Sequence, residues 1–591
     1  MHSFPSTIAL AAYVPSQPVR RTFIARTRMS KSLMVSSADV DILTTNQKIS
    51  SGDIKPNNKL HTVIVHRNRQ SIAFREGTPL VFGGSVVSTF TEDCAANDVT
   101  TDSDNNASSP LGIPLGSLVA VVVSKDSSPS YSGKRTKKDD SRGKKRNNSD
   151  SLGDKTEENA VPHYSFSSVN KETTYRDMIN QLQLIGYGVY NPKSMYRVRI
   201  LMHDTMHPGL TKEIRSMRKQ IQRGGDSQSL FDATHQLRLI LEKKISDATK
   251  TRLAMNLPSP SSDTYRLVNG EGDGISGLAV DILGGKTAIV MSSAAWCEIH
   301  RDTILAVLEE SLKEHPSYRN TNMDIVWRNT PSRLKQDGYE VVVPSSEDND
   351  DDDNMYTKTA DEMSVIASEN SVKYITYPYS DGQKTGFYCD QRDNRLMIAQ
   401  LCKNKRVLDL CCFNGGFALT AMIQGASSAI GVDSSQDAVD AATANAKLNG
   451  LTDSDISFVK ADIATFMKNA IDANNDYDVI ILDPPKLAPS VSSLERASKK
   501  YHALNRDAMN LINKEKGGLL LTCTCSAAMT QQDGGQYFLN VVNGAALSAR
   551  RRVTLLRVSG AAPCHTQSPA SFPAGQYLTA ALFHVGPSDI I

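Results

Sequence analysis

The C-terminal part of the chain alternates short apolar runs with longer segments of mixed apolar and polar residues. After about residue 390, apolar runs of strand length occur at 406–410, 429–433, 456–460, 478–483 and 518–523. Segments of helix length lie between them, for example at 435–449 and 494–513. Strands and helices in alternation are typical of βαβ units with a mostly parallel sheet. Such sheets bind ligands at the carboxyl ends of their strands, and functional residues are therefore expected there.

The first third of the chain has a different pattern. Strand-like runs begin at Leu60, Gly116 and Tyr196, and polar stretches at 93–109 and 125–171 separate them. These stretches bury too little apolar surface to fold alone, so we expect disordered inserts. The strand runs predict a small β-barrel domain over 51–203.

The segment between these two parts mixes both periodicities. A helical pattern covers 230–255, and strand-like runs follow at Gly277 and Lys286. An acidic run at 345–354 is expected to be a loop. The sequence thus predicts an α+β middle domain over 204–375, followed by an α/β domain of the Rossmann-like type over 376–591.

Composition leaves the partner open. Lys and Arg number 66 against 64 Asp and Glu, which gives a formal net charge of +2. A nucleic-acid partner would then need a local basic surface. The basic run at 134–146 is an RNA tether, a nuclear signal or a solvated insert. We favour the solvated insert because charge runs are usually solvated. No apolar run reaches about 18 residues, so no membrane partner is expected.

The N-terminal residues have the composition of a targeting segment. Residues 1–38 contain no Asp or Glu, and basic residues are interleaved with Ser and Thr. This composition is typical of a transit peptide. We expect 1–50 to be a transit peptide and disordered lead, and the protein to reach a mitochondrion or plastid. A cytoplasmic protein with a disordered N-terminus is the alternative.

Glycine and acidic residues stand where the strands of the C-terminal domain end. The first strand leads through Asp409 into a turn with Gly415 and Gly416. Glycines let a ligand approach the backbone, and the helix that follows presents free amide groups. The second strand ends in Asp433, where an acid binds ribose hydroxyls in nucleotide-binding sheets. These residues predict a site for a ligand that contains a ribose.

Two more acids, Asp462 and Asp483, follow the third and fourth strands. Asp462 is placed to accept a hydrogen bond from an adenine amino group. The turn after the first strand contains neither G-x-G-x-x-G nor G-x-x-x-x-G-K-[ST], which argues against a dinucleotide dehydrogenase and a P-loop enzyme. The remaining candidate is S-adenosylmethionine, a methyl donor that has an adenosyl group and no phosphates.

Several segments resemble the motifs of a known family. VLDLCCFNGGF, GVDSS, NAKLNG, KAD, LDPPK and LTCTCS look like successive motifs of class I methyltransferases. DGQKTGFYCDQRDNR at 381–395 is similar to a signature of bacterial large-subunit ribosomal RNA cytosine-5 methyltransferases. Residues 265–284 resemble that family's middle domain, and segments at 75–87, 113–122 and 186–201 resemble its PUA domain, a small RNA-binding barrel. Apart from the N-terminal lead and the inserts, the resemblance covers nearly the whole chain.

The resemblance implies a cofactor, a substrate and a set of residues. S-adenosylmethionine would be the cofactor and RNA, ribosomal by family, the substrate. The cofactor-binding residues would be Asp409, Asn414, Gly415, Gly416, Asp433, Asp462 and Asp483. No metal is expected, because the acids around 269–281 do not match a calcium loop.

Cytosine chemistry requires a cysteine. C5 of cytosine is a poor nucleophile until a thiolate adds to C6, so an activated cysteine must lie at the site. Cys523 and Cys525 are two positions apart, and they share a face if the strand continues through both. Strand geometry therefore leaves both open. By resemblance to the family's S-C-S pattern, Cys525 is the nucleophile and Cys523 is a core residue.

The DPPK segment departs from many cytosine-5 enzymes, because it contains no second cysteine. By resemblance, Asp483 would act on the base, while Pro484, Pro485 and Lys486 would contact the substrate. The D-P-P form also occurs in methyltransferases that act on amino groups of guanine or adenine. The alternatives are therefore a ribosomal RNA guanine methyltransferase and a non-catalytic RNA-binding ribosome assembly factor. The sequence names neither the modified nucleotide nor the general base.

Overall fold

The computed structural model describes residues 61–65, 79–82, 85–91, 100–101, 113–124, 182–204, 209, 233–341, 364–379 and 387–588. The predicted transit peptide, the insert at 125–171 with its basic run, and the acidic loop at 345–354 lie outside these residues. All described residues belong to one of the two units of the chain, Ser51–Ile591.

The N-terminal part forms a seven-stranded sheet. Its strands, in spatial order, are β2 (Leu80–Phe82), β7 (Tyr196–His203), β6 (Leu182–Tyr190), β5 (Leu118–Ser124), β1 (His61–Val65), β3 (Val86–Thr91) and β4 (Thr100–Thr101). β1 and β5 pair in parallel, and the other pairs are antiparallel. The expectation that all of 93–109 is a disordered insert is wrong at Thr100–Thr101, which pair with β3. Closure of the sheet into a PUA-like barrel stays a prediction.

The middle part is built on a four-stranded sheet. Its strands, in spatial order, are β11 (Asp324–Asn329), β10 (Thr287–Ser292), β9 (Leu278–Leu283) and β8 (Tyr265–Asn269). A hairpin of β12 (Val365–Glu369) and β13 (Val372–Thr376) follows. The helices are α4 (Ala233–Ala254), η3 (Gly270–Asp273), α5 (Ala295–Ile299), α6 (Arg301–Glu314) and α7 (Pro331–Gln336).

Helix α4 shows how the helical pattern at 230–255 packs against the middle sheet. Its buried apolar residues recur at helical spacing, and they join one core with the β-sheet and α6: Leu237, Ile240, Leu241, Ile245 and Ala248. An apolar stripe of this spacing is what drives a helix onto a sheet. None of the helices in the described ranges is both long and apolar enough to cross a bilayer.

The C-terminal part confirms the predicted Rossmann-like α/β fold. One sheet has the strand order β16 (Ile456–Lys460), β15 (Ser428–Asp433), β14 (Arg406–Leu410), β17 (Val479–Leu482), β18 (Gly518–Thr524), β20 (Thr579–Ser588) and β19 (Arg551–Ser559). The first five strands pair in parallel, and β20 pairs antiparallel with both β18 and β19. From β14 the chain continues outward through β15 and β16, and from β17 it continues in the other direction to β18. The carboxyl ends of β14 and β17 therefore flank the point where ligands bind in such sheets.

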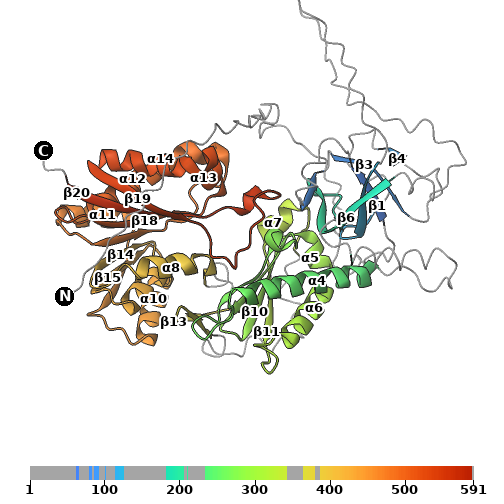
Figure 1. Ribbon diagram of the computed structural model, residues 1–591, viewed down its shortest axis with the longest axis horizontal. Helices are drawn as coiled ribbons and strands as arrows, with labels where there is room; N and C mark the ends of the chain where they lie inside the picture. Colours follow the sequence, from blue (N-terminus) through green and yellow to red (C-terminus); the bar gives the residue numbers. More distant parts are fainter. Residues whose placement is uncertain are drawn as a thin grey trace, which may run out of the picture. The chain divides into compact units, whose positions relative to one another are not determined.

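Helices cover both faces of this sheet (Figure 1). The remaining helices are η4 (Cys389–Gln391), α8 (Arg392–Ala399), α9 (Gly416–Ile423), α10 (Gln436–Leu448), α11 (Ile463–Asp472), η5 (Val491–Ser493), α12 (Leu494–Asn510), α13 (Ala527–Gln531), η6 (Gln532–Gly535), α14 (Gln536–Ser548) and η7 (Pro573–Gly575). α8, α9 and α10 pack on one face, while α11, α12 and α14 pack on the other. Covered strands need apolar side chains on both sides, which explains their nearly continuous apolar sequences.

Candidate active site

The turn between β14 and α9 brings its backbone close to neighbouring side chains. Gly415 has a φ of +84° and precedes the first residue of α9. A Cβ at Gly415 would lie 3.0 Å from Phe458 Cζ, and one at Gly416 would lie 3.0 Å from Arg395 Cδ. Larger residues would therefore strain or displace this turn. Both glycines predicted from the sequence lie at the carboxyl end of β14, beside the start of a helix.

Asp409 lies beneath this turn and is fully buried. Its Oδ2 accepts a hydrogen bond from the Ala418 amide at 3.0 Å, and its Oδ1 has no hydrogen-bond partner among the described residues. Burial raises the pKa of Asp409 to about 7. A buried carboxyl oxygen without a partner is a feature that a cationic or hydrogen-bonding ligand would satisfy.

Asp433 connects the turn to the end of β15. Its Oδ2 accepts from the Phe413 amide and its Oδ1 accepts from the Ser435 amide, each at 3.0 Å. A carboxylate oxygen has two acceptor positions, so each oxygen keeps one for another donor. Asp433 is half-buried, and its place agrees with a role toward a ribose hydroxyl.

Asp462 has a local hydrogen-bond partner, and Asn414 has a partner on α10. Asp462 is exposed and caps α11, since its Oδ1 accepts from the Thr465 amide at 3.0 Å and from the Thr465 hydroxyl at 3.2 Å. These hydrogen bonds lower the pKa of Asp462, and the bond from the Thr465 amide has the larger effect. The carbonyl of buried Asn414 accepts from Asn445 Nδ2 at 3.1 Å. Asn445 was not selected from the sequence, although its segment, NAKLNG, was among the motifs.

Asp483 follows β17 and receives a hydrogen bond from a distant segment. Gln391 Nε2 donates to Asp483 Oδ2 at 3.0 Å, and Asn394 Nδ2 donates to Gln391 Oε1 at 2.7 Å. Ser559 in turn donates to Asn394 Oδ1 at 2.7 Å. Gln391 and Asn394 are buried. Sequence reasoning missed both as site residues, although they belong to the 381–395 signature.

The structure separates the two cysteines that the sequence left open. Cys523 and Cys525 would share a face of the strand only if the strand continued through both. β18 ends at Thr524, so it does not include Cys525. Cys523 is fully buried in the core, and burial raises the pKa of its thiol well above the ordinary value. Cys525 lies beyond the strand and is partly exposed.

Buried hydroxyl groups hold the backbone on both sides of Cys525. The Thr524 hydroxyl is 2.8 Å from the Tyr501 hydroxyl, and Ser526 Oγ accepts from the Ala488 amide at 3.2 Å. Ala488 comes shortly after the Pro-Pro pair, so this bond joins the Cys525 segment to the loop that follows β17. The structure thus brings Cys525 and the DPPK segment together.

The rest of that loop differs in exposure. Pro484 is buried, whereas Pro485 and Lys486 are exposed. The Asp483 amide donates to the Leu410 carbonyl at 3.2 Å, which continues the pairing of β17 with β14. Exposure leaves Pro485 and Lys486 accessible to a large substrate, as their predicted role requires.

Two aromatic residues that sequence reasoning did not select also lie here. The rings of Tyr388 and Phe413 meet edge to face with their centroids 5.0 Å apart. Burial, together with the nearby Asp390 and Cys525, raises the pKa of Tyr388 to about 12. Tyr388 therefore remains a neutral aromatic surface beside Cys525 at physiological pH.

The comparisons with known proteins agree with this geometry. The profile of the S-adenosylmethionine-dependent methyltransferase family matches residues 352–547. A ribosomal RNA large subunit methyltransferase I from Aeromonas hydrophila is 35% identical over 314 residues, which cover 53% of this chain and 72% of the relative. The protein of that name from Shewanella frigidimarina is 36% identical over 314 residues, with the same coverage.

Solved structures show a similar fold. One, described as a methyltransferase complexed with SAH, aligns with 89% of this chain and 100% of its own, with a TM-score of 0.55 and 16% identity. Another, described as a SAM-dependent methyltransferase from Streptococcus mutans, aligns over the same shares with a TM-score of 0.54 and 15% identity. At these identities the likeness concerns the fold alone.

Proposed function

Because the chain belongs to the family of S-adenosylmethionine-dependent ribosomal RNA large-subunit methyltransferases, we propose that it methylates C5 of a cytosine in ribosomal RNA with Cys525 as the nucleophile. The single observation that carries the cysteine assignment is the position of Cys525. It is a partly exposed thiol that leaves the strand beside the Asp483 loop. A nucleophile must be reachable by the substrate and held in place, and Cys525 meets both requirements.

The other thiols at this end of the sheet suit the reaction less well. Burial raises the pKa of Cys411, and Asp433 and Asp483 nearby raise it further. Cys412 and Cys523 are buried, and their pKa values are also raised. Since the thiolate is the reactive form, these three cysteines stay unreactive near neutral pH.

The residues around the turn fit S-adenosylmethionine. The unpartnered Oδ1 of Asp409 suits a ligand that carries positive charge. The Gly415–Gly416 turn packs against Phe458 and Arg395, so that no larger residue fits there without displacing its neighbours. Asp433 would bind the ribose, and Asn414 and Asp462 would complete the site, with Asp483 at its edge toward the base. When bound, the cofactor supplies the methyl group that C5 of the cytosine receives.

The chain's own residues then handle the base. The Cys525 thiolate forms a bond to C6, which makes C5 electron-rich enough to accept a methyl group. After methylation, a base removes the C5 proton, the electrons of that C–H bond restore the C5–C6 double bond, and the C6–S bond breaks. Asp483 would hold the base through a hydrogen bond, and Gln391 orients Asp483. Pro485 and Lys486 would contact the RNA beside it.

The proposal is tested with RNA that carries 5-fluorocytosine at the target. Fluorine at C5 blocks the final elimination, so wild-type protein should form a complex with RNA that survives denaturant. Cys525→Ala should form no complex, whereas Cys523→Ala, the matched control, should still form it. Near-wild-type methylation by Cys525→Ala would overturn the cysteine assignment. Methylated guanine in the product would overturn the choice of base.

We also propose that the predicted transit peptide directs the protein to a mitochondrion or plastid. Fusions of a fluorescent protein to the full chain and to a chain without residues 1–50 test this. The first should enter an organelle and the second should remain in the cytoplasm. Equal distributions would contradict the proposal.

A further inference from the structure

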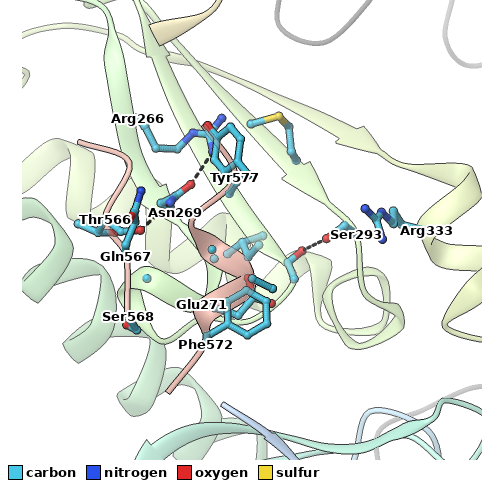
Figure 2. A pocket seen from close by; sticks show the side chains of 18 of the residues that line it. Arg266, Asn269, Glu271, Ser293, Arg333, Thr566, Gln567, Ser568, Phe572 and Tyr577 are labelled. Atoms are coloured by element: carbon cyan, nitrogen blue, oxygen red, sulfur yellow. Dashed lines mark hydrogen bonds between the residues drawn. The ribbon is translucent and has the colours of Figure 1, made fainter. Parts of the chain in front are cut away.

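A pocket lies outside the site described above (Figure 2). It has a volume of about 390 Å³, and its walls come from the middle sheet and from the segment 566–577 of the C-terminal part. Small-molecule sites typically span about 300 to 1,000 Å³. We propose that this pocket binds one unpaired nucleotide of the RNA substrate, close to the nucleotide that is methylated. This inference rests on the proposed RNA-modifying function.

Two aromatic rings line the pocket from one segment. Phe572 and Tyr577 are both half-buried, and Figure 2 shows their rings at opposite ends of the pocket. Unstacked RNA bases bind proteins by stacking on such rings. Gln531 Nε2 donates to the carbonyls of Pro573 and Gln576, each at 2.8 Å. The segment that carries the rings is therefore anchored before a ligand arrives.

The charges in the pocket are arranged for a nucleotide. Arg266 pairs with Asp281 and also donates to Asn269 Oδ1 at 2.8 Å, so its charge is already neutralised. Arg333 on α7 is exposed and has no ion pair or side-chain hydrogen bond among the described residues. A guanidinium of this kind suits a phosphate, because its fork of donors matches phosphate oxygens.

Glu271 supplies the complementary acceptor. Its Oε1 accepts from the Ser276 hydroxyl at 2.7 Å, while its Oε2 has no hydrogen bond within the described ranges. A carboxylate accepts hydrogen bonds and donates none, so this oxygen suits the exocyclic amino group of a base. Figure 2 shows Glu271 next to Phe572, whereas Arg333 lies on another side of the pocket beside Ser293. The two charges therefore suit different ends of one nucleotide.

The two walls of the pocket are held against each other. Asn269 Nδ2 donates to the Thr566 carbonyl at 2.8 Å, and a Cβ at Gly272 would lie 2.0 Å from the same oxygen. Since the backbones approach this closely, the pocket exists before binding. A preformed site of this kind loses little entropy when a ligand binds.

The pocket is connected to the site of methylation. The Tyr577 hydroxyl donates to Asp390 Oδ2 at 2.8 Å, and the next residue, Gln391, donates to Asp483. Gln531, which anchors the pocket segment, is the last residue of α13, and α13 begins two residues after Cys525. The same two segments, 390–391 and α13, thus contact both the pocket and the site of methylation. A nucleotide in the pocket would therefore be near the target in the RNA.

The experiment uses a series of RNAs, each with one abasic nucleotide at a different position on either side of the target. Methylation of each RNA is measured with wild-type protein and with Phe572→Leu. For wild type, removal of the base that occupies the pocket should raise KM for RNA about fivefold to a hundredfold, the range that loss of one stacked base produces. For Phe572→Leu, KM should be raised already with intact RNA, and the abasic nucleotide at that position should add little. KM for S-adenosylmethionine should stay unchanged.

Charge and volume variants complete the test. Arg333→Gln should raise KM for RNA, whereas Lys335→Gln, an exposed cation on the same helix that does not line the pocket, should leave it near wild type. Ala574→Trp should block the pocket from its exposed rim, which keeps the proposal testable if Phe572→Leu folds poorly. The proposal is overturned if these pocket variants bind RNA as wild type does, or if every abasic position affects wild type and Phe572→Leu equally.

The outcomes separate this proposal from the proposed function. If wild type yields 5-methylcytosine but every abasic position changes KM equally for wild type and Phe572→Leu, the pocket assignment is wrong and the proposed function stands. If the abasic position couples to Phe572 but the product is another methylated base, the pocket stands and the cytosine proposal fails.

Discussion

Gln391 Nε2 donates a hydrogen bond to Asp483 Oδ2 at 3.0 Å, across 92 positions of sequence. We expect Gln391→Leu to lower kcat about tenfold to a hundredfold, because a hydrogen bond to a charged group contributes about 1.5 to 3 kcal/mol. KM for S-adenosylmethionine should change little. Steady-state kinetics measure both, with Gln400→Leu, an exposed glutamine after α8, as the control. A folded Gln391→Leu protein with wild-type kcat would contradict this positioning role.

Asp433 is expected to contribute to cofactor affinity. Asp433→Ala removes the acceptors of the Phe413 and Ser435 amides and the group proposed for the ribose. Binding of S-adenosylmethionine should weaken about tenfold to a hundredfold, which corresponds to about 1.5 to 3 kcal/mol. Calorimetric titration measures this, and Asp440→Ala on the exposed face of α10 should bind normally. Unchanged affinity in Asp433→Ala would place this residue outside the site.

Asp409 should make stability depend on pH. Burial raises its pKa from 3.8 to about 7 in the folded protein. Between these values the unfolded chain has lost the proton and the folded chain retains it, so stability falls as pH rises. The contribution of Asp409 to the free energy of unfolding is fully present below 3.8, its pKa in the unfolded chain, and is lost above about 7. Between these values the free energy of unfolding falls by up to about 1.4 kcal/mol per pH unit.

The Asp409→Asn variant lacks this titration. Its free energy of unfolding relative to wild type should therefore increase from pH 5 to pH 7 and level off above. Urea denaturation across this range measures the difference. Parallel profiles for the two proteins would show that Asp409 titrates normally.

Arg252 is expected to be essential for stability. Its side chain is fully buried, pairs with Asp273 at 2.7 Å and donates to the Cys564 carbonyl at 2.6 Å. Arg252→Met leaves the Asp273 carboxylate, whose side chain is 6% exposed, without its ion-pair partner. Loss of one partner of a buried pair typically costs about 3 to 5 kcal/mol. Thermal denaturation should show a large drop in Tm. Lys243→Ala, which removes an exposed pair on the same helix, should change stability by less than about 0.5 kcal/mol.

Local sequence was enough to predict the α/β architecture and the ends of its strands. Apolar runs and helical spacing are local properties, and β14 to β18 and α10 form at the predicted places. The antiparallel strands β19 and β20 were not predicted. β19 is largely exposed and lacks a continuous apolar run, so only its pairing with β20 defines it.

Residue chemistry by itself indicated the glycine turn and the acids at the strand ends, because chain order places them at one edge of a parallel sheet. Only the tertiary structure decided what each one touches. It showed that Asp462 caps a helix, that Gln391 reaches Asp483, and that β18 ends between Cys523 and Cys525. It also joined residues near 270 and 570 into one pocket. Such contacts depend on packing between distant segments, and local periodicity carries no information about them.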